Sequence, residues 1–103
     1  MKKIYPPSIP HDQSMAELFA RKPKFAAECL KSAMEEATDE EGQQVLLAIM
    51  KQIALSKGLN KVAKRAKIPP ESLSRALSPR GNPRLSTLLP VIRAMGLHLT
   101  VRT

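Results

Sequence analysis

The residues best able to make specific polar contacts lie between Pro70 and Ser78. An arginine such as Arg75 can donate two parallel hydrogen bonds to a guanine edge, and a carboxylate such as Glu71 can accept one from a cytosine amine. We predict that five residues read base edges in this way: Pro70, Glu71, Ser72, Ser74 and Arg75. The alternative is that Glu71 and Arg75, four residues apart with the acid first, pair with each other on a solvated helix face.

A second group of residues around this stretch could bind phosphate, which gives affinity without sequence preference. The group comprises Asn60, Lys61, Lys64, Lys67, Ser78, Arg80 and Arg84. For Arg80 and Arg84 the alternative is that they are ordinary residues of a loop between two helices. Within that loop, Gly81 allows a positive φ and a close backbone approach, and Asn82 can hydrogen-bond locally, so we interpret both as structural.

The net charge of the chain is concentrated on the half that contains these residues. The 103 residues include 17 Lys or Arg and 9 Asp or Glu, a formal net charge of +8. Residues 1–58 hold equal numbers of the two signs, whereas residues 59–103 hold nine basic residues and one acid, Glu71. This asymmetry favours a polyanion such as double-stranded DNA as the partner of that half. The alternative is a basic face that only aids solubility.

Two short helices are predicted to position these side chains. Asn60 can cap the first, because its side-chain oxygen accepts a hydrogen bond from a free backbone N–H. A break follows at residues 67–69, and Pro70 falls at the first position of the second helix, where a missing N–H costs nothing. Apolar or small residues recur at helical spacing in both: Val62, Ala63 and Ala66, then Leu73, Ala76 and Leu77. This layout predicts a helix-turn-helix with residues 70–77 as the recognition helix.

Further helices are predicted on both sides of this pair. Asp12 or Ser14 can begin one, Pro23 begins the next, and a capping box of Thr38 and Glu41 begins a long one that ends at Gly58. A last helix is predicted from an apolar stripe that continues on both sides of Pro90: Leu85, Leu88, Leu89, Ile92 and Met95. We therefore predict an all-α fold, a five- to six-helix bundle.

The chain after Gly96 changes its pattern. Apolar residues alternate with polar ones, which predicts a short β-strand at residues 97–103. This strand either lies on the core as an extended tail or pairs with its copy in a homodimer through Leu97, Leu99 and Val101. We favour pairing, because unpaired strand edges are disfavoured.

The predicted organisation is a flexible arm at residues 1–11 and one domain at residues 12–103. The domain is divided into N-terminal helices at 12–58, a DNA-binding core at 59–96 and the C-terminal strand. No apolar run of 18 residues and no signal peptide is present, so we expect a cytoplasmic protein with no membrane segment.

Catalytic and metal-binding functions find no support in the sequence. The single cysteine, Cys29, lies among apolar residues at helical spacing, so we interpret it as a core thiol in a reducing compartment. His11 and His98 are far apart and have no second ligand nearby, so no metal site is expected. No spacing suggests a catalytic triad. We expect neither an enzyme nor a cofactor.

Residues 76–84, reading Ala-Leu-Ser-Pro-Arg-Gly-Asn-Pro-Arg, and residues 94–97, reading Ala-Met-Gly-Leu, carry a family resemblance. Together with residues 26–36 and 46–49, they resemble the putative addiction-module antidote proteins, the HigA-like antitoxins, within the Cro/C1-type (Xre-like) helix-turn-helix proteins. The resemblance covers the chain from about residue 12 onward. The pattern departs at Pro69, where a capping serine is usual, and at Ser74, where a larger residue is common.

The resemblance implies a dimeric bacterial antitoxin that represses its own operon and neutralises a small RelE/ParE-type toxin. We expect residues 12–58 to help hold the toxin; the rival site is the C-terminal strand. One alternative function is a stand-alone, phage-like transcriptional repressor without a toxin. Another is a basic RNA- or ribosome-associated protein, which the scarcity of aromatic residues disfavours, since RNA readers usually stack bases on aromatic side chains.

Overall fold

The longest helix, α3 (Glu40–Lys57), connects the two halves of the fold. Its first turn is stabilised by Asp39, whose carboxylate accepts a hydrogen bond of 2.8 Å from the Gly42 N–H. The sequence predicted Thr38 as the cap, which is one residue too early. The helix ends at Gly58, whose φ of 93° is a conformation that side chains rarely adopt.

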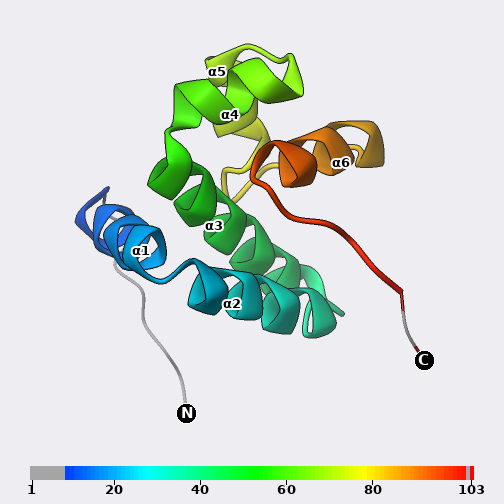
Figure 1. Ribbon diagram of the computed structural model, residues 1–103. Helices are drawn as coiled ribbons and strands as arrows, with labels where there is room; N and C mark the ends of the chain where they lie inside the picture. Colours follow the sequence, from blue (N-terminus) through cyan, green and yellow to red (C-terminus); the bar gives the residue numbers. More distant parts are fainter. Residues whose placement is uncertain (1–8, 102) are drawn as a thin grey trace.

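The computed structural model describes residues 9–101 and 103, and within them the fold is all-α (Figure 1). Its six helices are α1 (Ile9–Arg21), α2 (Pro23–Glu35), α3, α4 (Leu59–Ala66), α5 (Pro70–Ala76) and α6 (Leu85–Ala94). Helices α1 and α2 pack against α3, and α4 packs against α3, α5 and α6. In Figure 1, α3 passes between α1 and α2 at the lower left, α4 and α5 at the top and α6 at the right. No helix in the described part of the chain is both long and apolar enough to cross a membrane.

Helix α1 begins at Ile9, earlier than the predicted starts at Asp12 or Ser14. Residues 9–11 of the predicted arm are therefore helical, and residues 1–8 lie outside the described part. Asp12 connects α1 to α3, because its carboxylate accepts a 3.0 Å hydrogen bond from the Gln52 side chain and lies 3.5 Å from the Lys51 ammonium. Gln52 is only 5% exposed, so this bond satisfies a polar group inside the core.

One aliphatic core joins all six helices. Helix α2 contributes Ala26 and Leu30, and the most enclosed large side chains come from the other helices and their ends: Phe19, Met50, Ile53, Val62, Leu73, Leu77, Val91 and Met95. The predicted last helix is confirmed, with Pro90 inside it. Its first half is less buried than the stripe predicts, since Leu85 is 65% exposed.

The strand predicted at residues 97–103 is wrong for the single protomer, since residues 97–101 and 103 form no strand. Leu97 is half-buried against the core, and its N–H donates a 3.1 Å hydrogen bond to the Ile92 carbonyl. Beyond it, Leu99 is 45% and Val101 98% exposed. A strand needs a neighbouring strand to pair its backbone, and a single chain with no other strand does not supply one.

Candidate nucleic-acid interface

A tight turn at Lys67 joins α4 to α5. The Lys67 N–H bonds to the Lys64 carbonyl at 3.2 Å, and the Ile68 N–H bonds back to the Ala63 carbonyl at 3.0 Å. This pair of bonds closes the helix with Lys67 in the left-handed conformation, at φ 61° and ψ 42°. The two predicted short helices are thus present. The turn between them has a lysine, Lys67, in a backbone conformation that is usually occupied by glycine.

Helix α5 begins as predicted, with Pro70 at its first position. Pro69 precedes it in an extended conformation and provides no side-chain cap. Leu73 and Leu77 are buried and fix the helix against the core, whereas Ala76 is only half-buried.

The predicted base-reading residues share the outer side of α5. Pro70, Glu71 and Arg75 are exposed, and Ser72 and Ser74 are partly exposed. In the described part of the chain, Glu71 and Arg75 form no ion pair with each other. The local pair that was the alternative to base reading is thus not formed, and the exposed guanidinium of Arg75 faces solvent.

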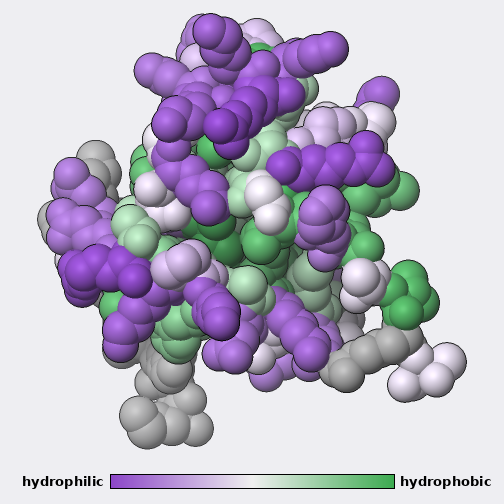
Figure 2. Space-filling view, viewed as in Figure 1, coloured by the Kyte–Doolittle hydropathy of each residue, from purple (hydrophilic) through white to green (hydrophobic). Residues whose placement is uncertain are grey.

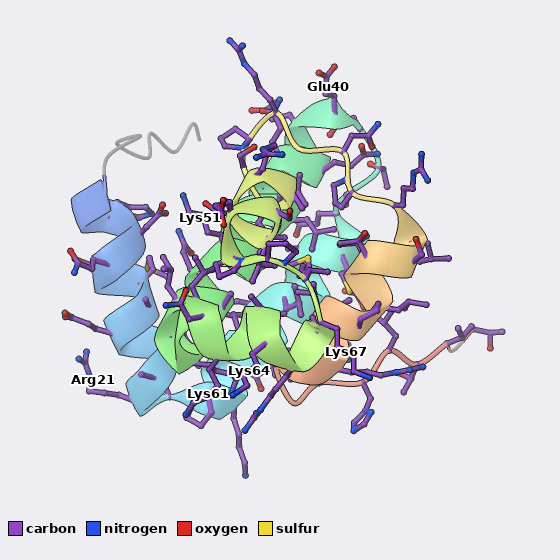
Figure 3. The ribbon with its side chains drawn as sticks, turned by 90° about the horizontal axis from the view of Figure 1, so that it is seen from above. Arg21, Glu40, Lys51, Lys61, Lys64 and Lys67 are labelled. Atoms are coloured by element: carbon purple, nitrogen blue, oxygen red, sulfur yellow. The ribbon has the colours of Figure 1, made fainter. Side chains whose placement is uncertain are left out.

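The three predicted phosphate-binding lysines follow α4 and its end: Lys61 and Lys64 lie on the helix, and Lys67 is the residue that caps it. Lys61, Lys64 and Lys67 follow one another at intervals of three residues, and all three are exposed. Figure 3 shows all three on one side of the molecule, in sequence along the helix. Figure 2 shows hydrophilic side chains gathered over α4 and α5. This helix edge is a row of cations with no acid on it.

Two other polar residues of α4, Asn60 and Arg65, differ from what the sequence predicted. Asn60 does not cap the helix, because α4 begins at Leu59 and Gly58 occupies the cap position. Its exposed side chain lies instead in the first turn. Arg65, which the prediction omitted, is exposed and four residues after Lys61, so it belongs to the same side of α4. That spacing was the signal that could have found it.

The loop after α5 is held by local hydrogen bonds. The Ser78 hydroxyl donates to the Arg75 carbonyl at 2.8 Å, and the Gly81 N–H donates to the Ser78 carbonyl at 2.8 Å. A serine hydroxyl has one hydrogen, so Ser78 could donate to phosphate only by breaking its present bond. Arg80 and Arg84 are exposed on this loop, with Arg84 immediately before α6.

Gly81 is required for space, not for a positive φ. Among the described residues, the glycines with a positive φ are Gly58 and Gly96, so the φ of Gly81 is not positive. A Cβ at Gly81 would overlap the carbonyl of Ala76 at the end of α5. The close backbone approach that glycine allows is confirmed, and the positive φ that it also allows does not occur at Gly81.

Other candidate chemistry is weak within the described part of the chain. There, no three metal-binding side chains lie together. Burial raises the pKa of the Cys29 thiol, and the neighbouring Glu28 carboxylate raises it further. A raised pKa leaves less thiolate and so a poorer nucleophile.

The chain is similar to known proteins over most of its length. The model of a family described as "Probable addiction module antidote protein" matches residues 14–103. An uncharacterized protein of Haemophilus influenzae is 30% identical over 69 residues, which cover 67% of this chain and 71% of that protein. No solved structure gives a significant match. The matched region includes α4, α5 and the loop through Arg84, and the chain therefore belongs to the family of probable addiction module antidote proteins.

Proposed function

We propose that the protein is a DNA-binding antidote that represses its own operon and neutralises the toxin encoded with it. The DNA-binding half of this proposal depends on one observation. Helices α4 and α5 meet at a tight turn, and the side that they leave exposed carries cations from Lys61 to Arg75 with a single acid, Glu71. A helix-turn-helix places its second helix in the major groove and its first across the backbone.

In this arrangement α5 reads bases and α4 binds phosphate. Glu71, Ser72, Ser74 and Arg75 would face base edges, and the row of lysines on α4, with Arg65, would neutralise phosphates. Arg80 and Arg84 would bind the backbone on the far side of α5. The absence of a serine cap at Pro69 removes one common polar group at the leading end of α5, where Pro70 would contact the groove by shape alone.

The test is binding to the DNA directly upstream of the gene, compared with an unrelated duplex of equal length. We expect the upstream duplex to bind about a thousandfold more tightly or better at physiological salt. Affinity for both should fall steeply as salt rises, because counterions are released from phosphates. Equal affinity for the two duplexes would contradict the repressor function.

A homodimer fits this function, because paired half-sites one helical turn apart need two recognition helices. We propose that residues 97–101 pair with their copy in the second protomer. Leu99 and Val101 support this, since both are exposed apolar side chains on a segment whose backbone has no strand neighbour.

The toxin half of the proposal follows from the family. The test is co-expression with the neighbouring open reading frame, whose product should arrest growth alone and not together with this protein. We expect the region of residues 12–58 to contribute to the complex through part of its surface. A neighbouring product that is harmless alone would favour the stand-alone repressor instead.

An RNA-binding function is less consistent with the site. Phe19 is buried in the core, Phe25 lies on α2, and Tyr5 is outside the described residues. The α4–α5 surface thus carries no aromatic side chain on which a base could stack.

A further inference from the structure

A groove lies between two segments that are far apart in the sequence. One wall is the first half of α3, and the other is the loop of residues 79–83 with Leu88 of α6. Its cavity volume is about 550 Å³, and it is lined by Glu40, Gln43, Gln44, Leu46, Leu47, Pro79, Arg80, Gly81, Asn82, Pro83 and Leu88. The predicted DNA-reading side chains of α5 take no part in it.

The apolar surface of this groove continues onto the outside of α6. Leu88 lines the groove, and Leu85 lies one turn before it on the same side of the helix, with 65% of its surface exposed. Leu85 and Leu88 are positioned to accept the apolar side of a helix.

The acidic residues around the groove favour a partner protein with a positive net charge. No Lys or Arg occurs between Lys31 and Lys51, while five exposed acids occur between Glu35 and Glu41. Glu40 is both a member of this acidic segment and a residue of the groove. Arg80 lines the groove from the opposite wall, so the groove offers an anion on one wall and a cation on the other.

The groove lies away from the lysines of the proposed DNA surface, and Arg80 is the one residue of its lining that belongs to that surface. Figure 3 places Glu40 on the opposite side of the molecule from Lys61, Lys64 and Lys67. Nucleic acid, which would be attracted to those lysines, would be repelled by the acidic side. A protein bound at the groove would leave the row of lysines open.

We propose that this groove holds the toxin, taking one amphipathic helix of a basic partner with its cationic end toward Glu40. This inference rests on the proposed antidote function and gives it a site. The apolar side of the bound helix covers Leu85 and Leu88. The site is built from both halves of the chain, since α3 supplies one wall and residues 79–88 supply the other.

The test measures how tightly the neighbouring gene product, the candidate toxin, binds full-length variants of this protein. The two proteins are purified together, separated, and titrated into each other in a calorimeter. Gln44→Arg places a cation in the groove, and Leu85→Glu places a charge on the exposed apolar surface of α6 beside it. Each residue is well exposed, so both variants should fold. We expect each to weaken the complex about tenfold or more, because like charges and buried unpaired charges are costly at interfaces.

Each variant has a matched control. Gln13→Arg makes the same substitution at an exposed position of α1, and Val45→Glu adds a charge on α3 outside the groove lining. Both controls should bind the product as the wild type does. Gln44→Arg and the two controls should bind the upstream DNA with affinities close to the wild-type value, and the folding of Leu85→Glu, which lies beside Arg84, is checked by circular dichroism.

The outcomes separate the two proposals. If the wild-type protein does not bind the product, the antidote function fails and the groove assignment fails with it. If the wild type binds and both groove variants bind equally well, only the groove assignment is overturned. Loss of binding in Leu99→Glu, with the groove variants unaffected, would place the toxin on the C-terminal segment instead.

Discussion

Arg75 and Lys64 are both exposed cations, but they are expected to contribute differently to DNA binding. Arg75 lies on the outer side of α5 with no ion pair to Glu71, whereas Lys64 lies along α4. A guanidinium at a base edge discriminates between sequences, whereas an ammonium at a phosphate does not. The same charge therefore gives specificity at one position and general affinity at the other.

Arg75→Ala should weaken binding to the upstream DNA by about 1–3 kcal/mol and change binding to random DNA little. Lys64→Ala should weaken binding to both duplexes alike and reduce the salt dependence by about one counterion. Fluorescence anisotropy at several salt concentrations measures both effects. If the Arg75 variant keeps the wild-type ratio of the two affinities, the assignment of α5 as the reading helix is wrong.

The contacts of Asp12 with Gln52 and Lys51 should contribute unequally to the free energy of unfolding. Asp12→Ala would leave the buried Gln52 amide without its acceptor, which should lower the free energy of unfolding by about 1–3 kcal/mol. Lys51→Ala removes only a partly exposed ion pair and should cost less than about 1 kcal/mol. Urea denaturation of the two variants compares them directly. Equal losses would show that the carboxylate stabilises α1 through Lys51 and not through Gln52.

At the scale of elements, the sequence predicted which helices exist better than where they begin. Prolines at Pro23 and Pro70 marked two starts correctly, because a first helical position is the place where proline is tolerated. Polar caps were less decisive. Thr38 and Asp39 are adjacent and both residue types can cap a helix, so the sequence allowed either start, and the structure uses the carboxylate of Asp39.

The turn and the loop could be predicted only in part. A break near Lys67 follows from the sequence, but a lysine in the left-handed region does not, since nothing in its side chain requires that conformation. The role of Gly81 depends on the path by which the loop returns past Ala76, a tertiary feature. The groove between α3 and this loop joins residues some forty positions apart, so no local pattern could have indicated it.

The turn at Lys67 allows stability and DNA affinity to be separated. Lys67→Gly should raise the free energy of unfolding by about 1 kcal/mol, because glycine adopts the left-handed conformation without strain. Lys67→Ala keeps the strain and should give no such gain. Both variants lose the same cation and should weaken DNA binding equally. Unequal affinities would mean that Lys67 acts through the geometry of the turn and not through phosphate.

The charges of the folded molecule lie on two sides, one basic and one acidic. The α4 lysines and the acidic residue Glu40 lie on opposite sides, so a polyanion and a basic protein would be attracted to different surfaces (Figure 3). Helix α3 spans the distance between them, beginning at the acidic end and ending beside α4. One small core thus supports two surfaces of opposite charge.

The C-terminal segment should determine whether the molecule acts alone or as a pair. Leu97 is tied to the core by packing and by its bond to Ile92, so it belongs to the folded unit of one protomer. Leu99, 45% exposed, and Val101, 98% exposed, are the residues that a partner strand could cover. A cut after Leu97 therefore removes the proposed interface and spares the core, whereas a cut after Gly96 would damage both.

Removing residues 98–103 should give a monomer by sedimentation equilibrium with an unfolding free energy close to that of one wild-type protomer. Its affinity for the upstream DNA should fall steeply, because the two half-sites would then be bound independently and the second recognition helix would no longer be held near its site. The full-length double variant Leu99→Asp, Val101→Asp should behave in the same way, since like charges would face each other across the twofold axis. Thr100→Asp, at a polar position of the same segment, is the control for added charge and should remain dimeric. A truncated protein that stays dimeric would place the dimer interface elsewhere, on the apolar residues of α6 or on α2.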